Sequence, residues 1–171
     1  MLPAAYSAQG HLRDGRPVKI RALQPDDEAS MLAAIDRTGT ESLKRRFFVT
    51  KRGFSENEKA FFMNIDFVNH VALVVEIDEG GATAIIGGGR YVVVESGEAE
   101  MAFIVVDAYQ GQGIGAILAR HLVGLARAAG LKQLSADVLP ENTAMRRVLG
   151  KFGFQASGRD PQVVHLTLPL V

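Results

Sequence analysis

One short stretch, Gln-Gly-Gln-Gly-Ile-Gly at residues 110–115, constrains the fold of this chain more than any other. It follows an apolar run at residues 101–106 and precedes a helix-patterned segment at residues 116–129, so a strand, a glycine-rich turn and a helix come in succession. Glycines let a backbone approach a ligand without a clash of Cβ atoms. The free N–H groups of a first helical turn, with the positive end of the helix dipole, attract anions. The turn therefore predicts a site for a phosphate-bearing ligand.

The pattern of apolar residues around this turn predicts one domain over residues 1–171, built on a mixed sheet. Residues 1–16 look like a loose lead-in, and the triple glycine at residues 87–89 predicts a bulge or a close backbone approach within its strand. Short turns make the three strands between residues 71 and 106 antiparallel. The predicted fold class is α/β (an α+β mixed sheet), with a mostly antiparallel central sheet and helices on both faces. The expected strands cover residues 17–23, 71–77, 82–94, 98–106, 131–139, 154–157 and 163–168, and the expected helices cover residues 25–36, 41–48, 55–63, 116–129 and 143–152.

Composition argues against several classes of function. The 19 basic and 19 acidic residues cancel, so no overall field points to a nucleic acid or an anionic membrane. The chain contains no cysteine, which excludes a disulfide framework, a cysteine-based zinc site and a thiol nucleophile. No apolar run approaches the ~18 residues of a membrane span, and no signal peptide is recognisable, so a cytoplasmic location is expected. His121 has no second ligand at metal spacing, so a packed histidine is expected there and no metal.

Three kinds of glycine loop compete for the turn. A P-loop needs a Lys-Ser or Lys-Thr pair that is absent here. The dinucleotide fingerprint matches Gly111, Gly113 and Ala116, with Asp137 on the following strand. However, only 60 residues follow Gly111, too few for the rest of a dinucleotide-binding sheet, and the strands before it form hairpins. The third pattern is Gln/Arg-x-x-Gly-x-Gly/Ala after a strand, which starts here at Gln110.

Residues 98–154 resemble the GNAT superfamily of N-acetyltransferases. The resemblance depends on this third pattern, on Asn142 after the next strand and on Gly153-Phe154 after the last helix, in that order. It implies a GNAT-like fold with acetyl-CoA as cosubstrate. The turn would bind the pyrophosphate through backbone N–H groups, and Gln110 would brace it. The preceding strand and Asn142 would bind the pantetheine arm, although Asn142 is also a good helix N-cap. The implied cofactor-binding residues are Ile104, Val105, Val106, Gln110, Gly111, Gln112, Gly113, Ile114, Gly115, Ala116 and Asn142.

The implied chemistry is attack of an amine on a thioester. A lysine amine has a pKa of ~10.4 and must lose a proton first, which a positioned carboxylate can accept. Glu95, Glu98 and Glu100 flank the turn at residues 96–97, and Glu100 lies inside the strand. Residues 100–111 also resemble the acetyltransferase domain of the bacterial protein lysine acetyltransferase Pat. That resemblance implies Glu100 as the catalytic general base.

The sequence departs from the GNAT pattern at the residue that protonates the departing thiolate. Many GNAT enzymes have a tyrosine after the asparagine, and that position is Leu149 here. Tyr109 and Tyr91 could replace it, but structural roles are expected for both. A thiol with a pKa of ~8.5 leaves reasonably well as a thiolate, so the absence is tolerable. A backbone N–H near Val105 would stabilise the oxyanion.

The sequence therefore predicts an acetyl-CoA-dependent N-acetyltransferase that uses direct transfer. A protein lysine is favoured as acceptor over a small-molecule amine, and a non-catalytic acyl-CoA-binding or sensing module is the alternative from another class. The side chains of the helices between residues 26 and 67 would select the acceptor. The basic segment at residues 44–46 is more often a solvated helix face than a site, but it could also meet an acidic acceptor or the 3′-phosphate of CoA. No transferable code relates these side chains to an acceptor, and a homodimer stays open.

Overall fold

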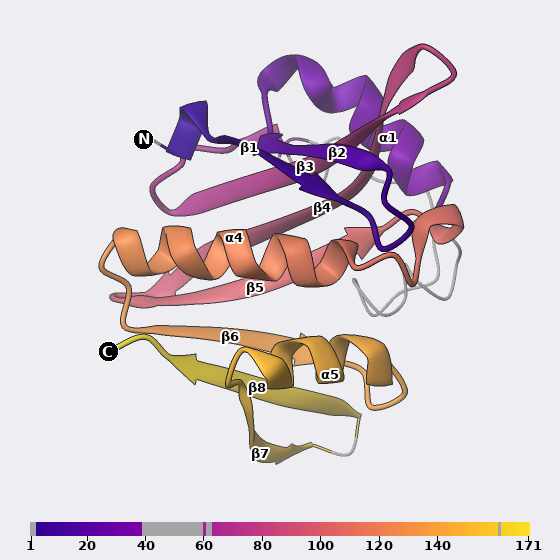
Figure 1. Cartoon of the computed structure of the whole chain (residues 1–171). Helices are drawn as coiled ribbons and strands as arrows, with labels where there is room; N and C mark the ends of the chain where they lie inside the picture. Colours follow the sequence, from indigo (N-terminus) through magenta and orange to yellow (C-terminus); the bar gives the residue numbers. More distant parts are fainter. Residues whose placement is uncertain (1–2, 39–59, 61–62, 161) are drawn as a thin grey trace.

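A computed structural model of the chain describes residues 3–38, 60, 63–160 and 162–171. Its centre is an eight-stranded sheet in the order β1-β2-β3-β4-β5-β6-β8-β7, drawn in Figure 1. The helices expected at residues 41–48 and 55–63 lie outside the described residues, apart from residues 60 and 63. The strands are β1 (Ser7–His11), β2 (Pro17–Ala22), β3 (His70–Glu79), β4 (Ala82–Glu95), β5 (Glu98–Val105), β6 (Gln133–Val138), β7 (Gln155–Asp160) and β8 (Val163–Pro169), and the helices are α1 (Glu28–Asp36), α4 (Ile114–Ala128) and α5 (Thr143–Lys151).

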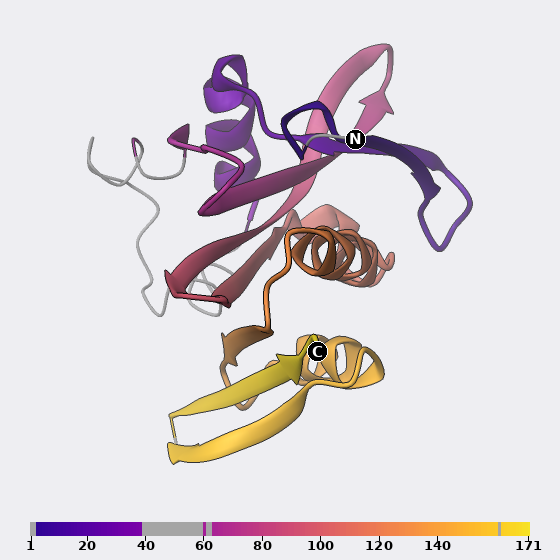
Figure 2. The same cartoon turned by 90° about the vertical axis from the view of Figure 1, so that its left-hand side faces the viewer.

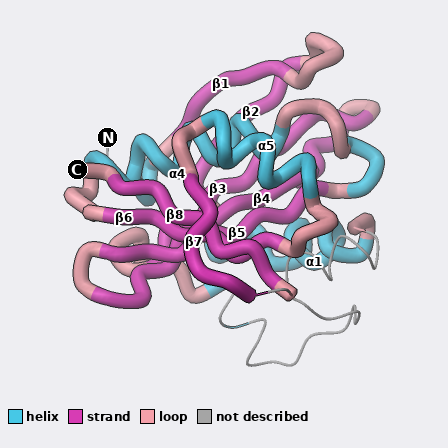
Figure 3. The backbone as a smooth tube through the Cα atoms, turned by 90° about the horizontal axis from the view of Figure 1, so that it is seen from below, coloured by secondary structure: helices cyan, strands magenta, loops and turns pink. Residues whose placement is uncertain are grey.

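The sheet is mostly antiparallel, as expected: within the described chain, the pair β5–β6 is parallel and the other neighbouring pairs are antiparallel. Helices cover both faces. Figure 2 shows α1 on one side of the sheet and α4 and α5 on the other, and α4 and α5 lie side by side in Figure 3. The predicted fold class is therefore confirmed.

The N-terminal segment is not the loose lead-in that the sequence suggested. Residues 7–11 form β1, which pairs with β2 from Ser7↔Arg21 to His11↔Pro17. The prediction was wrong because β1 is an edge strand of small and polar residues, Ser-Ala-Gln-Gly-His, without apolar alternation. Its order depends on hydrogen bonds to β2, which local sequence does not reveal.

The triple glycine in β4 allows α4 to approach the sheet closely. A Cβ on Gly87 would lie 2.7 Å from Ile114 Cγ2 of α4, whereas a Cβ on Gly88 would face the opposite side, 3.8 Å from Met31 Cε of α1. The register of β3 against β4 also shifts next to this run, between Val75 and Glu76. The close approach and the bulge that the sequence predicted are both present.

We expect Gly87→Ala to lower the free energy of unfolding by about 2 kcal/mol, because the new methyl group overpacks the contact between β4 and α4. The matched control is Gly124→Ala in the exposed face of α4, where a Cβ meets nothing within 4 Å. That control should stabilise the protein by about 1 kcal/mol, since alanine is the better helix former. Urea unfolding measures both, and a stabilised Gly87→Ala variant would contradict the packing argument.

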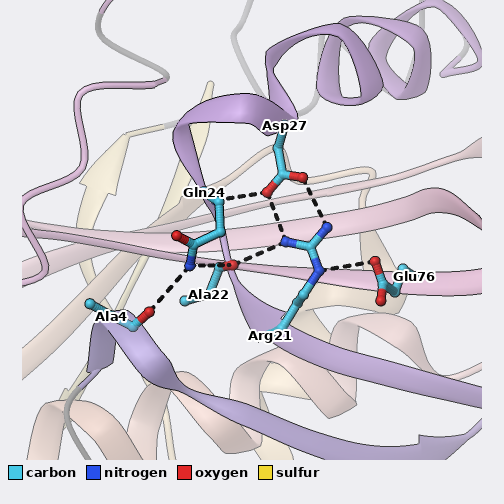
Figure 4. Close-up of polar contacts among 6 residues, drawn as sticks. All are labelled: Ala4, Arg21, Ala22, Gln24, Asp27 and Glu76. Carbon is cyan, nitrogen blue, oxygen red and sulfur yellow. Dashed lines mark hydrogen bonds and ion pairs between the residues drawn. The ribbon is translucent and has the colours of Figure 1, made fainter.

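A partly buried ion cluster joins β2, β3 and the start of α1 (Figure 4). Arg21 donates two hydrogen bonds to Asp27, of 2.7 and 2.9 Å, and one of 2.9 Å to Glu76. The N–H of Gln24 donates to the same Asp27 carboxylate at 2.7 Å. Burial alone would raise the pKa of Asp27, but the hydrogen bonds from Arg21 and Gln24 and the Arg21 charge outweigh burial and lower it. The cluster thereby fixes the angle at which the chain leaves β2 for α1.

Candidate active site

The strands β5 and β6 separate in the middle of the sheet. They pair in parallel only over Glu98↔Gln133, Ala99↔Leu134 and Glu100↔Ser135, although β5 continues to Val105 and β6 to Val138. Both strands keep their other neighbours along these stretches. Figure 1 shows them diverging toward their C-terminal ends, where α4 begins. One edge of β5, over residues 101–105, therefore has no strand partner among the described residues.

The backbone of β5 directs hydrogen-bonding groups into this separation. The N–H of Val106 donates to Ile86 O of β4 at 3.0 Å, so it points away from β6. Because successive N–H groups of a strand alternate in direction, those of Phe103 and Val105 point toward β6. An extended ligand could pair with this edge as a missing strand would.

The glycine turn lies at the wide end of the separation. Gly111 and Gly113 have φ angles of 80° and 88°, a left-handed conformation that glycine adopts without strain, and Gly113 is the N-cap of α4. The first helical hydrogen bond runs from Ile117 N–H to Gly113 O, 3.0 Å. Within the described part of the chain, the N–H groups of residues 111–116 have no acceptor. The turn thus presents free donors at the positive end of a helix dipole.

Charged and aromatic side chains stabilise the segment that precedes this turn. Glu79 accepts hydrogen bonds of 3.1 and 2.9 Å from Arg37 and a further one from the Tyr109 hydroxyl. The Arg37 bond, followed by the Tyr109 bond, holds the pKa of Glu79 below its usual value. The Asp107 N–H donates to Arg37 O at 3.2 Å, and the Gln110 side chain donates to Asp107 at 3.3 Å. Tyr109 therefore has the structural role expected for it.

The residues around Asn142 keep the arrangement inferred from the sequence. The Asn142 side chain accepts a hydrogen bond from Met145 N–H at 3.3 Å and caps α5. Its amide nitrogen has no protein partner among the described residues. The position where many GNAT enzymes have tyrosine is occupied by Leu149, which is fully buried and cannot act as an acid. Tyr91 is also buried in the core, and burial raises the pKa of its hydroxyl.

Glu100 occupies the last paired position of β5, where the two strands part. Its side chain is exposed and shares the α1 face of the sheet with Ala102 and Ile104. A small cavity between α1 and the sheet is lined by Met31, Arg90 and those two residues, among others. Glu100 therefore stands beside the open edge of β5, on the face opposite α4. Glu98 shares that face farther from the separation, and Glu95 is an exposed residue across the turn.

Sequence reasoning missed two polar residues on the same face. Arg90 and His70 are only 7% and 6% exposed, and the Arg90 guanidinium lies 2.9 Å from His70 Nε2. Arg90 lies on β4, next to the strand of Glu100, where it is paired with Ala102. His70 lies one strand farther away, on β3, where it is paired with Val92. A cation inside the apolar run at residues 82–94 was the available signal for Arg90, whereas nothing local marks His70.

His121 is packed against a neighbouring aromatic ring, as its sequence context led us to expect. The ring of His121 packs edge-on against Tyr6 with centroids 5.5 Å apart, and the Tyr6 hydroxyl is within hydrogen-bonding distance of Nδ1. Burial, followed by the nearby Arg120 charge, lowers the pKa of His121.

Across the residues that the structure describes, no three His, Cys, Asp or Glu side chains gather to hold a metal ion. No described helix has the length and apolar character that a membrane span requires.

Comparison with known sequences identifies the family. The profile of the acetyltransferase (GNAT) family matches residues 39–154. The chain belongs to the GNAT family. It is therefore an acetyl-CoA-dependent N-acetyltransferase, and the GNAT fold expected from its sequence is confirmed.

Individual relatives support this assignment. The chain is 34% identical over 159 residues to Acetyltransferase PA5475 of Pseudomonas aeruginosa, and these residues cover 90% of this chain and 85% of that protein. It is 30% identical over 144 residues to Acetyltransferase Pat of Mycolicibacterium smegmatis, covering 83% of this chain but 42% of Pat. The crystal structure of the GNAT domain of S. lividans PAT superimposes with a TM-score of 0.86 at 31% identity, covering 95% of this chain and 96% of that domain. The resemblance to Pat that residues 100–111 suggested is confirmed.

Proposed function

We propose that this GNAT enzyme transfers the acetyl group of acetyl-CoA directly to a protein lysine, with Glu100 as the general base. The observation that carries the proposal is the separation of β5 from β6 immediately after Glu100. It combines an open strand edge for the cosubstrate with an exposed carboxylate on the opposite face from α4. Cosubstrate and acceptor can then approach the same strand from different directions, as direct transfer requires.

In this proposal the glycine turn binds the pyrophosphate of acetyl-CoA. Residues 111–116 supply the free N–H groups, and Gln110 braces the turn through its bond to Asp107. The pantetheine arm pairs with β5 at residues 104–106 and with the amide of Asn142, whose carbonyl oxygen is occupied by its capping bond. The ligand thus lies between β5 and β6, with its thioester close to Glu100.

The residues near the thioester can supply most of the chemistry. Glu100 accepts the proton of the lysine ammonium, directly or through water, which typically accelerates such a step by ~10²–10⁴-fold. The N–H groups of Phe103 and Val105 point into the separation, and one of these donors near Val105 stabilises the oxyanion. The thiolate leaves without an acid from α5, because Leu149 has replaced the tyrosine and a thiol has a pKa of only ~8.5.

Two observations favour a protein lysine over a small amine. Residues 100–111 resemble the bacterial protein lysine acetyltransferase Pat, and the structural match to the GNAT domain of S. lividans PAT covers 96% of that domain. Glu100 is also exposed, so a side chain on a large acceptor can reach it. Small metabolites are more often bound in concave sites that bury most of their surface.

The acceptor class can be tested with matched substrates. We expect CoA release from acetyl-CoA with lysine-containing peptides and folded proteins, and no release when arginine replaces each lysine. Mass spectrometry should place the acetyl groups on lysine Nζ. Turnover only with polyamines, amino sugars or amino acids would instead indicate a small-molecule acetyltransferase. Acetyl-CoA binding without turnover on any amine would indicate a binding module.

A further inference from the structure

The tip of the β1–β2 hairpin is hydrogen-bonded to the glycine turn. The backbone N–H of Arg13 donates to Gln112 O at 2.9 Å, and the N–H of Asp14 donates to the Gln112 side-chain oxygen at 3.2 Å. Figures 1 and 2 show the hairpin reaching from the edge of the sheet to the start of α4. Both acceptors belong to one residue in the middle of the turn, so the hairpin holds that residue at two points.

These bonds determine the direction of the next peptide N–H. In a trans peptide the C=O and the N–H that share the bond point in opposite directions. The C=O of Gln112 points to the hairpin, so the N–H of Gly113 points away from it. Gly113 has a φ of 88°, and its glycine backbone could otherwise rotate between several conformations. The hairpin therefore selects one orientation of a donor at the N-terminus of α4.

A second contact joins the hairpin to the entrance of the turn. The Arg16 guanidinium carbon lies 5.2 Å from the centroid of the Tyr109 ring, and Arg16 is hydrogen-bonded to Asp14 at 2.8 and 3.0 Å. Tyr109 is in turn bonded to Glu79. The hairpin tip thus contacts the glycine turn at Gln112 and just before it at Tyr109. Residues 7–22 precede the segment matched by the family profile, which begins at residue 39.

We infer that the β1–β2 hairpin is a positioning element of the cosubstrate site, acting through Gln112 on the orientation of the Gly113 N–H. The inference rests on the proposed binding of the acetyl-CoA pyrophosphate at residues 111–116. A donor held in its bound orientation before the ligand arrives loses less conformational entropy on binding. The hairpin should therefore strengthen acetyl-CoA binding without touching the reacting atoms.

One substitution removes the main contact and leaves the turn intact. Gly15 N–H donates to Leu12 O at 2.9 Å, so Arg13 is the second residue of a β-turn, a position that proline favours. Arg13→Pro deletes the N–H that donates to Gln112. Its reference is Arg13→Ala, which loses the same side chain but keeps the N–H. By calorimetry, we expect the Kd for acetyl-CoA to be about fivefold higher in Arg13→Pro than in Arg13→Ala.

Equal Kd values for the two variants would overturn the inference, as would a lower melting temperature in Arg13→Pro without any change in Kd. If Arg13→Pro fails to fold, Gln112→Ala removes the bond from Asp14 N–H and should raise Kd by a similar factor. An unchanged Kd in Gln112→Ala would then overturn the inference. The wild-type protein separates this result from the parent proposal. If acetyl-CoA at saturation does not raise its melting temperature, the proposed cosubstrate site fails, and the inference fails with it.

Discussion

Replacing Glu100 by glutamine is expected to lower kcat for lysine acetylation by about 10²–10⁴-fold and to leave the Kd for acetyl-CoA unchanged. Glutamine keeps the size of the side chain but cannot accept the proton of the attacking ammonium. Since a free lysine amine has a pKa of ~10.4, very little of it is deprotonated at pH 7 without a base. Steady-state CoA release and calorimetric titration with acetyl-CoA measure the two quantities separately.

The matched control is Glu98→Gln, on the same strand and the same face but farther from the separation of β5 and β6. We expect Glu98→Gln to lower kcat by less than a tenth of the fold-change that Glu100→Gln produces. The difference in kcat between Glu100→Gln and the wild type should also become smaller as the pH rises toward the pKa of the amine, because more of the acceptor is then deprotonated in solution. Equal kcat values for Glu100→Gln and wild type would exclude Glu100 as the base.

Arg21→Ala is expected to lower the free energy of unfolding by about 3 kcal/mol, which is the lower end for breaking a buried ion pair. The substitution leaves the carboxylates of Asp27 and Glu76 without their shared guanidinium, and the Arg21 and Asp27 side chains are only 20% and 11% exposed. The control Arg16→Ala removes an ion pair whose side chains are 50% and 37% exposed, so a far smaller loss is expected. Urea unfolding at pH 7 compares the two, and similar losses would contradict a special role for the Arg21 cluster.

The same cluster should make stability depend on pH in a definite direction. The folded-state pKa of Asp27 lies below its unfolded value, so its contribution is fully present above the unfolded pKa of ~3.9. That contribution is lost as the pH falls through the folded pKa. The stability difference between wild type and Asp27→Asn should therefore be largest near neutral pH and shrink below about pH 4. A difference that stays constant down to pH 3 would contradict this assignment.

Local sequence signals predicted most of the fold, because each depends on neighbouring residues. The apolar face of α4 and the capping residue Asn142 are visible within a few residues of the chain. Within the described residues, the expected strands and helices from residue 17 onward are present. The exception, β1, has no amphipathic pattern, and its pairing with β2 supplies the backbone partners that its own sequence cannot indicate.

The candidate site could be predicted only in part from the sequence. The glycine turn could be predicted because its residue types and spacing are characteristic, and Glu100 because residues 100–111 resemble Pat. Arg90 and His70 were not, since they come from different strands and meet only through sheet register. The contact between the hairpin and Gln112 joins residues 98 positions apart, and no local pattern encodes it.

The sequence by itself therefore determined that a strand, a glycine turn and a helix follow one another, and that the family is GNAT. Only the tertiary structure decided where β5 leaves β6, which face carries Glu100 beside an open strand edge, and that an N-terminal hairpin holds Gln112. The physical reason is the range of the interactions involved. Backbone propensity and helix capping act over a few residues, whereas strand separation and the direction of a peptide N–H depend on partners brought together by the folded sheet.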